Sequence, residues 1–389
     1  MKRNLHNLIQ AIPACLERIS LYLKDNAFKA CTMDLNFFLE ILGIPSTSGE
    51  EKALAQFLKE QLVLRGPNGI QVFEYVVGDG TLNLLFDWSG TGKPSFVFCT
   101  HLDTVPPFIA PSIDLVKKGD RLPDGKIAAQ DDTIVKGRGS CDAKGQVFSM
   151  YNACLELQKE GYTDFGLLLL AGEETGSWGA KAYTRDCPGG AFVLVGEPTD
   201  NHLVSASKGT KAFEVTIPGR ACHSGYPEHG SSAVEKFVDL MNTLKLVEFP
   251  DDPVLGPTTW NVGDLHSNNP QNILSPEIDF RIYFRTTFAT DELIQNKLLG
   301  ACPPGTVVRA FGGDTPQEYF HEVDGIPSKP ASFGSDAPRL TKFQRKAICG
   351  PGSILTAHTD KEYVLLSEME KAVEQYVRIF KSVTGNKQE

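Results

Sequence analysis

The sequence predicts an α/β protein, in which an α/β/α sandwich on a mostly parallel sheet carries an inserted ferredoxin-like α+β domain. Three observations lead to this prediction. Short buried strands alternate with amphipathic helices up to about residue 206. Residues 207–314 then change to half-exposed strands and two helices in the order β-α-β-β-α-β. After residue 314 the first pattern returns and continues to the C-terminus.

The composition is that of a globular protein with enough apolar residues for two domains. The chain has 389 residues, of which 41% are hydrophobic and 22% charged, and its net charge is −10. This acidic balance argues against nucleic acid or an anionic membrane as the main partner. No apolar run approaches the ~18–20 residues of a spanning helix. Nine cysteines with irregular spacing and no CxxC motif indicate reduced, mostly buried thiols in a cytoplasmic protein.

The change of pattern also predicts the domain boundaries. We expect residues 1–206 and 315–389 to form one larger domain, and residues 207–314 to form a self-contained domain inserted into it. The N-terminal apolar positions from Leu5 to Leu23 indicate an amphipathic helix packed on the body of the protein. Alternatively, translation begins at Met33, where the recognisable part of the chain starts.

The larger domain is expected to open with two helices and three strands. Residues 34–63 indicate a helix, a break and a second helix, with Ser46–Ser48 as the cap of the second helix and Glu50 and Glu51 in its first turn. Strands are expected at 70–77, 82–87 and 95–100. Residues 111–135 are expected to form a polar loop that is long enough to be functional.

The later elements follow from the same periodicities. We expect strands at 166–171, 191–196, 211–217, 258–264, 278–286, 307–311 and 346–349, and helices at 147–160, 231–246, 291–299 and 367–383. Ser232 and Glu235 form a capping-box pattern at the start of one helix. The glycines of residues 136–145 match neither GxxxxGK[ST] nor GxGxxG, so a nucleotide site is not predicted.

Candidate functional residues follow the buried strands or open the helices of the larger domain. The stretch PSFVFCTHLDTVPP, residues 94–107, is the clearest case, because a buried strand ends directly in His101 and Asp103. Such a pair is often only a hydrogen-bonded loop. The complete set is His101, Asp103, Asp142, Glu173, Glu174, Glu197 and His358. Parallel strands end at one edge of a sheet, so we expect these side chains to meet there.

Two imidazoles and several carboxylates form a ligand set suited to Zn²⁺, Co²⁺ or Mn²⁺. Five such ligands exceed what one tetrahedral zinc with an open position takes, and they suit two metal ions that share a bridging carboxylate and a bridging water. The doublet Glu173–Glu174 supplies a ligand and a general base, because adjacent side chains leave the backbone in different directions. The alternative, a solvated surface pair, is disfavoured because the doublet directly follows buried residues 167–170.

Six motifs resemble the co-catalytic zinc deacylases and exopeptidases, a family that includes acetylornithine deacetylase, succinyl-diaminopimelate desuccinylase, aminoacylase and glutamate carboxypeptidase. In chain order they are THLDTVP, GRGSCDAKG, GEETGS, GEPT, HSGYP and GPGSILTAHTDKEYV, within residues 33–381. The resemblance implies two zinc ions. It places His101 and Glu197 on one ion and Glu174 and His358 on the other. It makes Asp142 the bridging ligand.

The same resemblance implies roles for further residues. Glu173 would act first as general base and then as general acid, and Asp103 would orient His101. His223 resembles a histidine that reaches into the partner subunit's site and stabilises the oxyanion. This implies a homodimer in which residues 207–314 form the lid and dimerisation domain, and residues 1–206 and 315–389 form the catalytic metal-binding domain. Asn272 and Arg285 resemble the pair that binds the substrate carbonyl and carboxylate.

The C-terminal part of the chain bears most on the substrate. FGSDAPRL at 333–340 and GPGSILTAHT at 350–359 are most similar to the acetylornithine deacetylase branch, which implies deacetylation of acetylornithine in arginine biosynthesis. The alternatives are a dipeptidase or carboxypeptidase, a deacylase of acetylcitrulline or succinyl-diaminopimelate, and a non-catalytic binding protein on the same scaffold. The family usually carries a helix where residues 312–332 are short and proline-bearing here.

Overall fold

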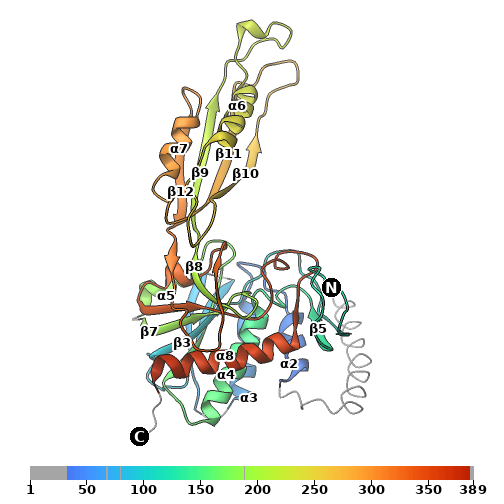
Figure 1. The fold of residues 1–389 in the computed structure, drawn as a ribbon, viewed down its shortest axis with the longest axis vertical. Coiled ribbons are helices and arrows are strands. Elements are labelled where there is room, and N and C mark those ends of the chain that lie inside the picture. The colour runs from blue at the N-terminus through green and yellow to red at the C-terminus, as the bar shows by residue number, and fades with distance from the viewer. Residues whose placement is uncertain (1–32, 67–68, 79, 188, 386–389) are drawn as a thin grey trace. The chain divides into compact units, whose positions relative to one another are not determined.

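The computed structural model describes residues 33–385 except 67–68, 79 and 188. The predicted N-terminal helix lies outside these residues. The chain divides into two compact units, each drawn in Figure 1. The first contains the chain up to His202, Val323–Ile326 and Arg339–Glu389, and the second contains Leu203–Glu322 and Pro327–Pro338. The predicted boundaries after residues 206 and 314 fall inside the second unit and remain a prediction.

The first unit is built on a six-stranded sheet with the order β1-β2-β6-β3-β7-β15. The strands are β1 (Gln71–Gly78), β2 (Thr81–Asp87), β3 (Phe96–His101), β6 (Phe165–Leu170), β7 (Gly190–Val195) and β15 (Phe343–Ile348). Strands β6, β3, β7 and β15 are parallel, whereas β2 pairs antiparallel with both β1 and β6. Every residue of β2, β3 and β6 is buried. The prediction of a largely parallel, buried sheet is therefore confirmed.

Helices cover both faces of this sheet. They are α2 (Leu35–Gly43), α3 (Lys52–Arg65), α4 (Lys144–Lys159), α5 (Trp178–Asp186) and α8 (Leu366–Thr384). Glu74 of β1 forms an ion pair with Lys59 of α3, while the ring of Tyr75 meets that of Tyr183 of α5 edge-on at 5.5 Å. Consecutive strand residues point to opposite faces, so α3 and α5 lie on opposite sides. Helices α4 and α8 pack side by side (Figure 1). The α/β/α sandwich is confirmed.

A small second sheet corrects the prediction of a polar loop at 111–135. Strands β4 (Ser112–Val116) and β5 (Asp132–Lys136) pair antiparallel, and β16 (Tyr363–Leu365) pairs with the other edge of β5. Ile134 and Tyr363 form a buried cluster with Leu122 and Ala128. Five-residue strands with so few apolar positions give a weak alternation, and the partner strand β16 comes more than 200 residues later. Sequence periodicity therefore missed them.

The second unit contains a four-stranded antiparallel sheet with the order β10-β11-β9-β12. Its elements are β9 (Gly209–Pro218), α6 (Ala233–Leu246), β10 (Thr259–His266), β11 (Glu277–Thr286), α7 (Ile294–Ala301) and β12 (Val307–Asp314). Alternate residues of β11, from Ile278 to Phe284, are buried in one cluster with side chains of both helices. The predicted β-α-β-β-α-β order is confirmed. Strands β8 (Leu203–Ser207), β13 (Gln317–Glu318) and β14 (Ser328–Ala331) form a further three-stranded sheet in this unit.

The predicted helix caps have different outcomes. Ser232 caps α6 by accepting a hydrogen bond from the Glu235 N–H at 3.3 Å. The prediction that Ser46–Ser48 caps the second helix was wrong, because α3 begins at Lys52 and its N-cap residue, Glu51, makes no side-chain capping bond. The serine hydroxyls instead donate to Leu102 and Asp103 in the loop after β3. These hydroxyls therefore bind distant buried oxygen atoms and not the N–H groups at the start of α3.

Two expectations from composition bear on the described part of the chain. Among its seven cysteines, five are buried and two, Cys222 and Cys302, are partly exposed. No helix within the described ranges is long and apolar enough to span a membrane.

Candidate metal centre

His101 is the last residue of β3, and its ring is almost fully buried. Nδ1 lies 2.9 Å from the backbone oxygen of Asp103 and 3.3 Å from Asp103 Oδ1. A carbonyl oxygen only accepts, so Nδ1 carries the proton in the neutral ring and Nε2 keeps its lone pair. Nε2 points to Asp142, with 3.1 Å to Oδ1. This arrangement of a histidine fixed through one nitrogen is typical of a metal ligand.

Asp142 and His358 complete the next part of the group. Asp142 lies two residues before α4 and is buried. Its Oδ1 faces His101, whereas its Oδ2 is 3.4 Å from Nε2 of His358. The same His358 nitrogen is 2.9 Å from Glu174 Oε2. The two oxygens of Asp142 thus face two different imidazoles.

The donor set fits divalent metal ions. Ligand atoms of His101, Asp142 and Glu174 all lie within 4.8 Å of one another. Two ligands of one tetrahedral zinc with bonds of about 2.0 Å are separated by about 3.3 Å. The contacts between Asp142 and each imidazole, at 3.1 and 3.4 Å, are close to this separation. Nitrogen and carboxylate oxygen donors without a thiolate suit Zn²⁺, Co²⁺ or Mn²⁺.

Glu197 and Glu173 belong to the loops that follow β7 and β6. Glu197 follows β7, which pairs with β3 through Val195 and Cys99, and it is buried at the same edge of the sheet as His101. It is outside the three-residue group that the described residues bring within 4.8 Å. Glu173 is half-buried and immediately precedes Glu174. Both sequence-predicted roles therefore remain predictions.

Asp103 does more than orient His101. Its Oδ1 accepts a hydrogen bond from the Glu173 N–H at 3.0 Å, and its Oδ2 accepts one from the Glu174 N–H at 3.1 Å. The Ser48 hydroxyl donates to Oδ2 at 2.7 Å. One buried carboxylate therefore fixes the ring of His101 and the backbone of the glutamate doublet together.

Charge pairing controls the titration of these groups. Burial lowers the pKa of His101, but hydrogen bonds to Asp103 and Asp142 outweigh it and hold that pKa well above its ordinary value. Hydrogen bonds to Asp142 and Glu174 raise the pKa of His358 to about 10. Burial raises the pKa of Asp142, yet the two histidines hold it below its usual range. A metal ion binds the neutral imidazole, so metal binding at these histidines is coupled to proton release.

Sequence reasoning missed Glu362 and Arg138. Their side chains are almost fully buried and form an ion pair with Nη1 to Oε2 at 2.6 Å. Glu362 Oε1 also accepts hydrogen bonds from the N–H groups of Cys141 and Asp142, both at 3.2 Å. Burial, followed by repulsion from Asp142, raises the pKa of Glu362 to about 7, against the effect of Arg138. The one signal in the sequence was the position of Glu362 four residues after His358.

The remaining predicted residues lie in the second unit. His223 and Asn272 are exposed and adjacent, because Ser224 N–H donates to the Asn272 carbonyl at 2.9 Å and His223 bridges to Ile273. His223 Nδ1 accepts from the Gly225 N–H at 3.1 Å, so Nε2 carries the proton of the neutral ring and can donate. Arg285 lies on β11.

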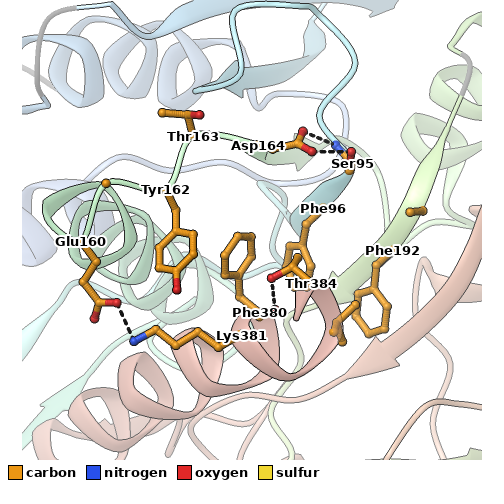
Figure 2. A pocket seen from close by; sticks show the side chains of 13 residues that line it. Ser95, Phe96, Glu160, Tyr162, Thr163, Asp164, Phe192, Phe380, Lys381 and Thr384 are labelled. Atoms are coloured by element: carbon orange, nitrogen blue, oxygen red, sulfur yellow. Dashed lines mark hydrogen bonds and ion pairs between the residues drawn. The ribbon is translucent and has the colours of Figure 1, made fainter. Parts of the chain in front are cut away.

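A pocket of about 860 Å³ lies at the opposite end of the parallel strands. It is lined by Phe96 and Phe192, which stand at or near the starts of β3 and β7, and by Phe380 of α8. Figure 2 shows the ion pair between Glu160 and Lys381, which also line it. Since the candidate ligands follow the ends of these strands, this pocket is separate from the metal centre.

Comparisons with known proteins agree with this geometry. A sequence model described as Peptidase family M20/M25/M40 matches residues 97–382. A probable carboxypeptidase from Emericella nidulans is 30% identical, covering 89% of this chain and 88% of its own. A peptidase M20 domain-containing protein from Schizosaccharomyces pombe is 29% identical, covering 87% and 82% respectively.

Solved structures show the same fold. A tripeptidase from Staphylococcus aureus superposes with a TM-score of 0.70 at 20% identity, covering 90% of this chain and 97% of that chain. An M20 family metallo-carboxypeptidase from Sulfolobus solfataricus gives a TM-score of 0.65 at 16% identity, covering 90% and 99%. Since the family match spans most of the sequence, the chain belongs to peptidase family M20/M25/M40, whose members are metal-dependent hydrolases of peptide and other amide bonds.

Proposed function

We propose that this protein is a dinuclear metal-dependent exopeptidase that cleaves an amide bond beside the free carboxylate of a small peptide. The observation that carries the proposal is the division of Asp142, whose two oxygens face His101 and His358 separately. A carboxylate shared in this way suits a pair of metal ions. His101 and Glu197 would hold one ion, Glu174 and His358 the other, and zinc fits this donor set.

Bound divalent ions would act as Lewis acids on the substrate carbonyl and lower the pKa of water to near neutrality. The residues of the chain supply the remaining chemistry. Glu173 takes a proton from the attacking water and passes it to the leaving nitrogen. Asp103 keeps this glutamate in place through its backbone N–H. The Nε2–H of His223 is a suitable donor to a developing oxyanion, and a homodimer through the second unit would bring it to the partner's site.

Arg285 is the proposed partner of the substrate carboxylate. It lies in the second unit with Lys208, whose pKa is lowered by burial and then by repulsion from the Arg285 guanidinium. Two neighbouring cations create a positive potential suited to an anionic group. Nη1 of Arg285 is also close to Gly334 in the FGSDAPRL segment: a Cβ added to Gly334 would lie 3.9 Å from it. Asn272 is the proposed ligand of the substrate carbonyl.

The comparisons favour a peptide substrate. The relatives from Emericella nidulans and Aspergillus oryzae are named probable carboxypeptidases, and the structural neighbours include a tripeptidase and a human carnosine dipeptidase. Deacetylation of acetylornithine is the second candidate. It is supported by the similarity of the segments at 333–340 and 350–359 to the acetylornithine deacetylase branch.

Replacement of Glu173 tests the mechanism. Glu173→Ala should lower kcat by about 10²–10⁴-fold, because it removes general acid–base catalysis. The metal content should stay near that of the wild type, because Glu173 is not among the proposed ligands. Mass spectrometry of the purified protein measures the metal. Glu60→Ala, at an exposed position of α3, is the control and should be fully active. Full activity of Glu173→Ala would rule out this mechanism.

A substrate panel tests the specificity. It contains dipeptides, tripeptides and their C-terminally amidated forms, together with acetylornithine, acetylcitrulline and succinyl-diaminopimelate, each with Zn²⁺ or Co²⁺. We expect cleavage of free peptides, weak cleavage of amidated ones, and a raised KM for free peptides in Arg285→Ala. Faster turnover of acetylornithine than of any peptide would support the second candidate instead.

A further inference from the structure

Residues 46–51 form a segment that binds two loops of the metal centre. One loop follows β3 and contains Asp103, and the other follows β6 and contains Glu173 and Glu174. The Ser46 hydroxyl donates to the Leu102 carbonyl at 2.8 Å, and the Ser46 carbonyl accepts from the Thr104 N–H at 2.9 Å. Ser48 donates to Asp103, as described above. These contacts hold the segment against the loop that follows His101. The sequence had indicated only a helix cap here.

Glu51 extends from this segment to the other loop. Its side chain is fully buried, and Oε1 accepts hydrogen bonds from the Gly49 N–H at 3.0 Å and the Gly172 N–H at 3.1 Å. Burial of a carboxylate is unfavourable unless it is hydrogen-bonded. A buried glutamate at this position is therefore explained by the N–H groups that it accepts from. Capping of helix α3 does not explain it, because the Glu51 side chain makes no capping bond to this helix.

The Gly172 N–H is the first of three consecutive N–H groups bound by buried carboxylates. Glu51 accepts from Gly172, and Asp103 accepts from Glu173 and Glu174. Gly172 itself has a φ of +66°, and a Cβ there would lie 1.9 Å from the Trp178 ring. The backbone at this point has little freedom, so its direction decides where the next side chain goes.

We propose that Glu51 is a positioning residue for Glu173. The inference rests on the proposed role of Glu173 as general base. Glu51 fixes the start of the turn and Asp103 fixes its continuation. Catalytic groups must be held to within about 0.5 Å of their productive position, and a displacement of about 1 Å lowers the rate by about 10²-fold. Without the Glu51 carboxylate, the turn loses the anchor at its first residue.

Substitution of Glu51 tests the proposal against a matched control. Glu51→Ala should lower kcat by about 10–100-fold with little change in KM or metal content. Glu51→Gln should recover most of the rate, because its amide oxygen can still accept from Gly172. Glu50→Ala changes the same residue type one position earlier, where the side chain is exposed, and should leave kcat unchanged. A merely structural role would lower the melting temperature of Glu51→Ala while leaving kcat of the folded protein intact.

A double-mutant cycle shows whether Glu51 acts through Glu173. In the Glu173→Ala background, a further Glu51→Ala change should cause no additional loss of kcat, since the group that it positions is absent. An additive loss would overturn the proposal. If Glu51→Ala does not fold, Glu51→Asp gives the same cycle, because its carboxylate is one methylene group further from the Gly172 N–H. An additive or absent effect of Glu51→Asp would also contradict the proposal.

The two hypotheses fail in different ways. Full activity of Glu173→Ala removes the proposed mechanism and the role of Glu51 with it. Inactive Glu173→Ala together with a wild-type kcat in folded Glu51→Ala leaves the mechanism intact and rejects only the positioning role.

Discussion

At the scale of single residues, buried carboxylates outside the proposed metal ligands hold the backbone of the residues that carry those ligands. Asp103 accepts backbone N–H groups of the glutamate doublet, and Glu362 accepts those of Cys141 and Asp142. Each replaces the hydration of its own charge by several donors, as burial requires. The same bonds fix loops that have no regular secondary structure. The positions of the candidate ligands therefore depend on residues outside the ligand set.

Removal of the Glu362 carboxylate should weaken metal binding. In Glu362→Ala, two N–H groups beside Asp142 lose their acceptor and Arg138 becomes an unpaired buried cation, which costs about 3–5 kcal/mol of folding free energy. We expect metal affinity to fall by about 10–100-fold, as measured by competition with a chelator. Glu374→Ala, at an exposed position of α8, is the control. Unchanged affinity in Glu362→Ala would contradict this role.

The sequence predicted four of the five candidate ligands because each follows a strand or precedes a helix that its own neighbours define, whereas His358 lies ten residues after β15. His101, for example, directly ends a run of six buried residues. The local sequence of Glu51 indicates only the start of α3, and that of Glu362 gives no sign of its role. Their acceptor oxygens bind backbone groups that are 121 and 220 residues away, at Gly172 and Asp142. Contacts of this kind depend on tertiary structure, and no periodicity encodes them.

At the scale of elements, the start of α4 is fitted closely to the loop that presents Asp142. Gly145 lies in the first turn of this helix, and a Cβ there would be 2.1 Å from the Ser140 carbonyl oxygen. Its φ is not positive, so the backbone conformation does not itself require glycine. Close approach of the helix to residues 140–142 is what requires it.

The same substitution in two helices should therefore have opposite effects. Gly145→Ala forces the helix and the loop apart and should destabilise the protein by about 1–3 kcal/mol, with weaker metal binding. Gly300→Ala, in α7, places a methyl group where nothing lies within 4 Å, and it should stabilise by about 0.5–1 kcal/mol. Urea denaturation of both variants measures the change. Equal effects on stability would contradict the steric explanation.

Element prediction succeeded where a strand or helix is defined by its own residues. The continuous apolar runs of β3, β6 and β7 and the 3.6-residue period of α8 are examples. It failed for β4 and β5, whose alternation is weak and whose pairing with β16 joins distant parts of the chain. The cap predicted at Ser46–Ser48 was wrong for a related reason, because these hydroxyls donate to the loop after β3 and not to the helix end.

At the scale of the whole molecule, the two units have separate cores. All five candidate ligands belong to the first unit, whereas Phe280, His223 and Arg285 belong to the second. The change from buried parallel strands to half-exposed alternating ones made this division predictable from sequence. The boundaries were less accessible, because β8, β13 and β14 are too short to give a clear period.

Perturbing each unit separately should separate their thermal stabilities. A chelator removes the proposed metal ions, which bind only the first unit. It should therefore lower the midpoint temperature at which that unit unfolds. Phe280→Ala opens a cavity in the core of the second unit and should cost about 3–5 kcal/mol there. Differential scanning calorimetry of the wild type and variant, with and without chelator, measures both. A single transition that shifts equally in every case would contradict independent cores.

The pairing of β15 with β7 has a consequence for synthesis on the ribosome. These neighbouring strands are separated by the whole second unit, since β7 ends at Val195 and β15 begins at Phe343. At roughly 5–20 residues per second, the edge of β7 waits on the order of ten seconds for its partner. An open strand edge invites aggregation and chaperone binding during that time. The unit that begins the chain is therefore the one that finishes folding last, and His358 reaches the other ligands only then.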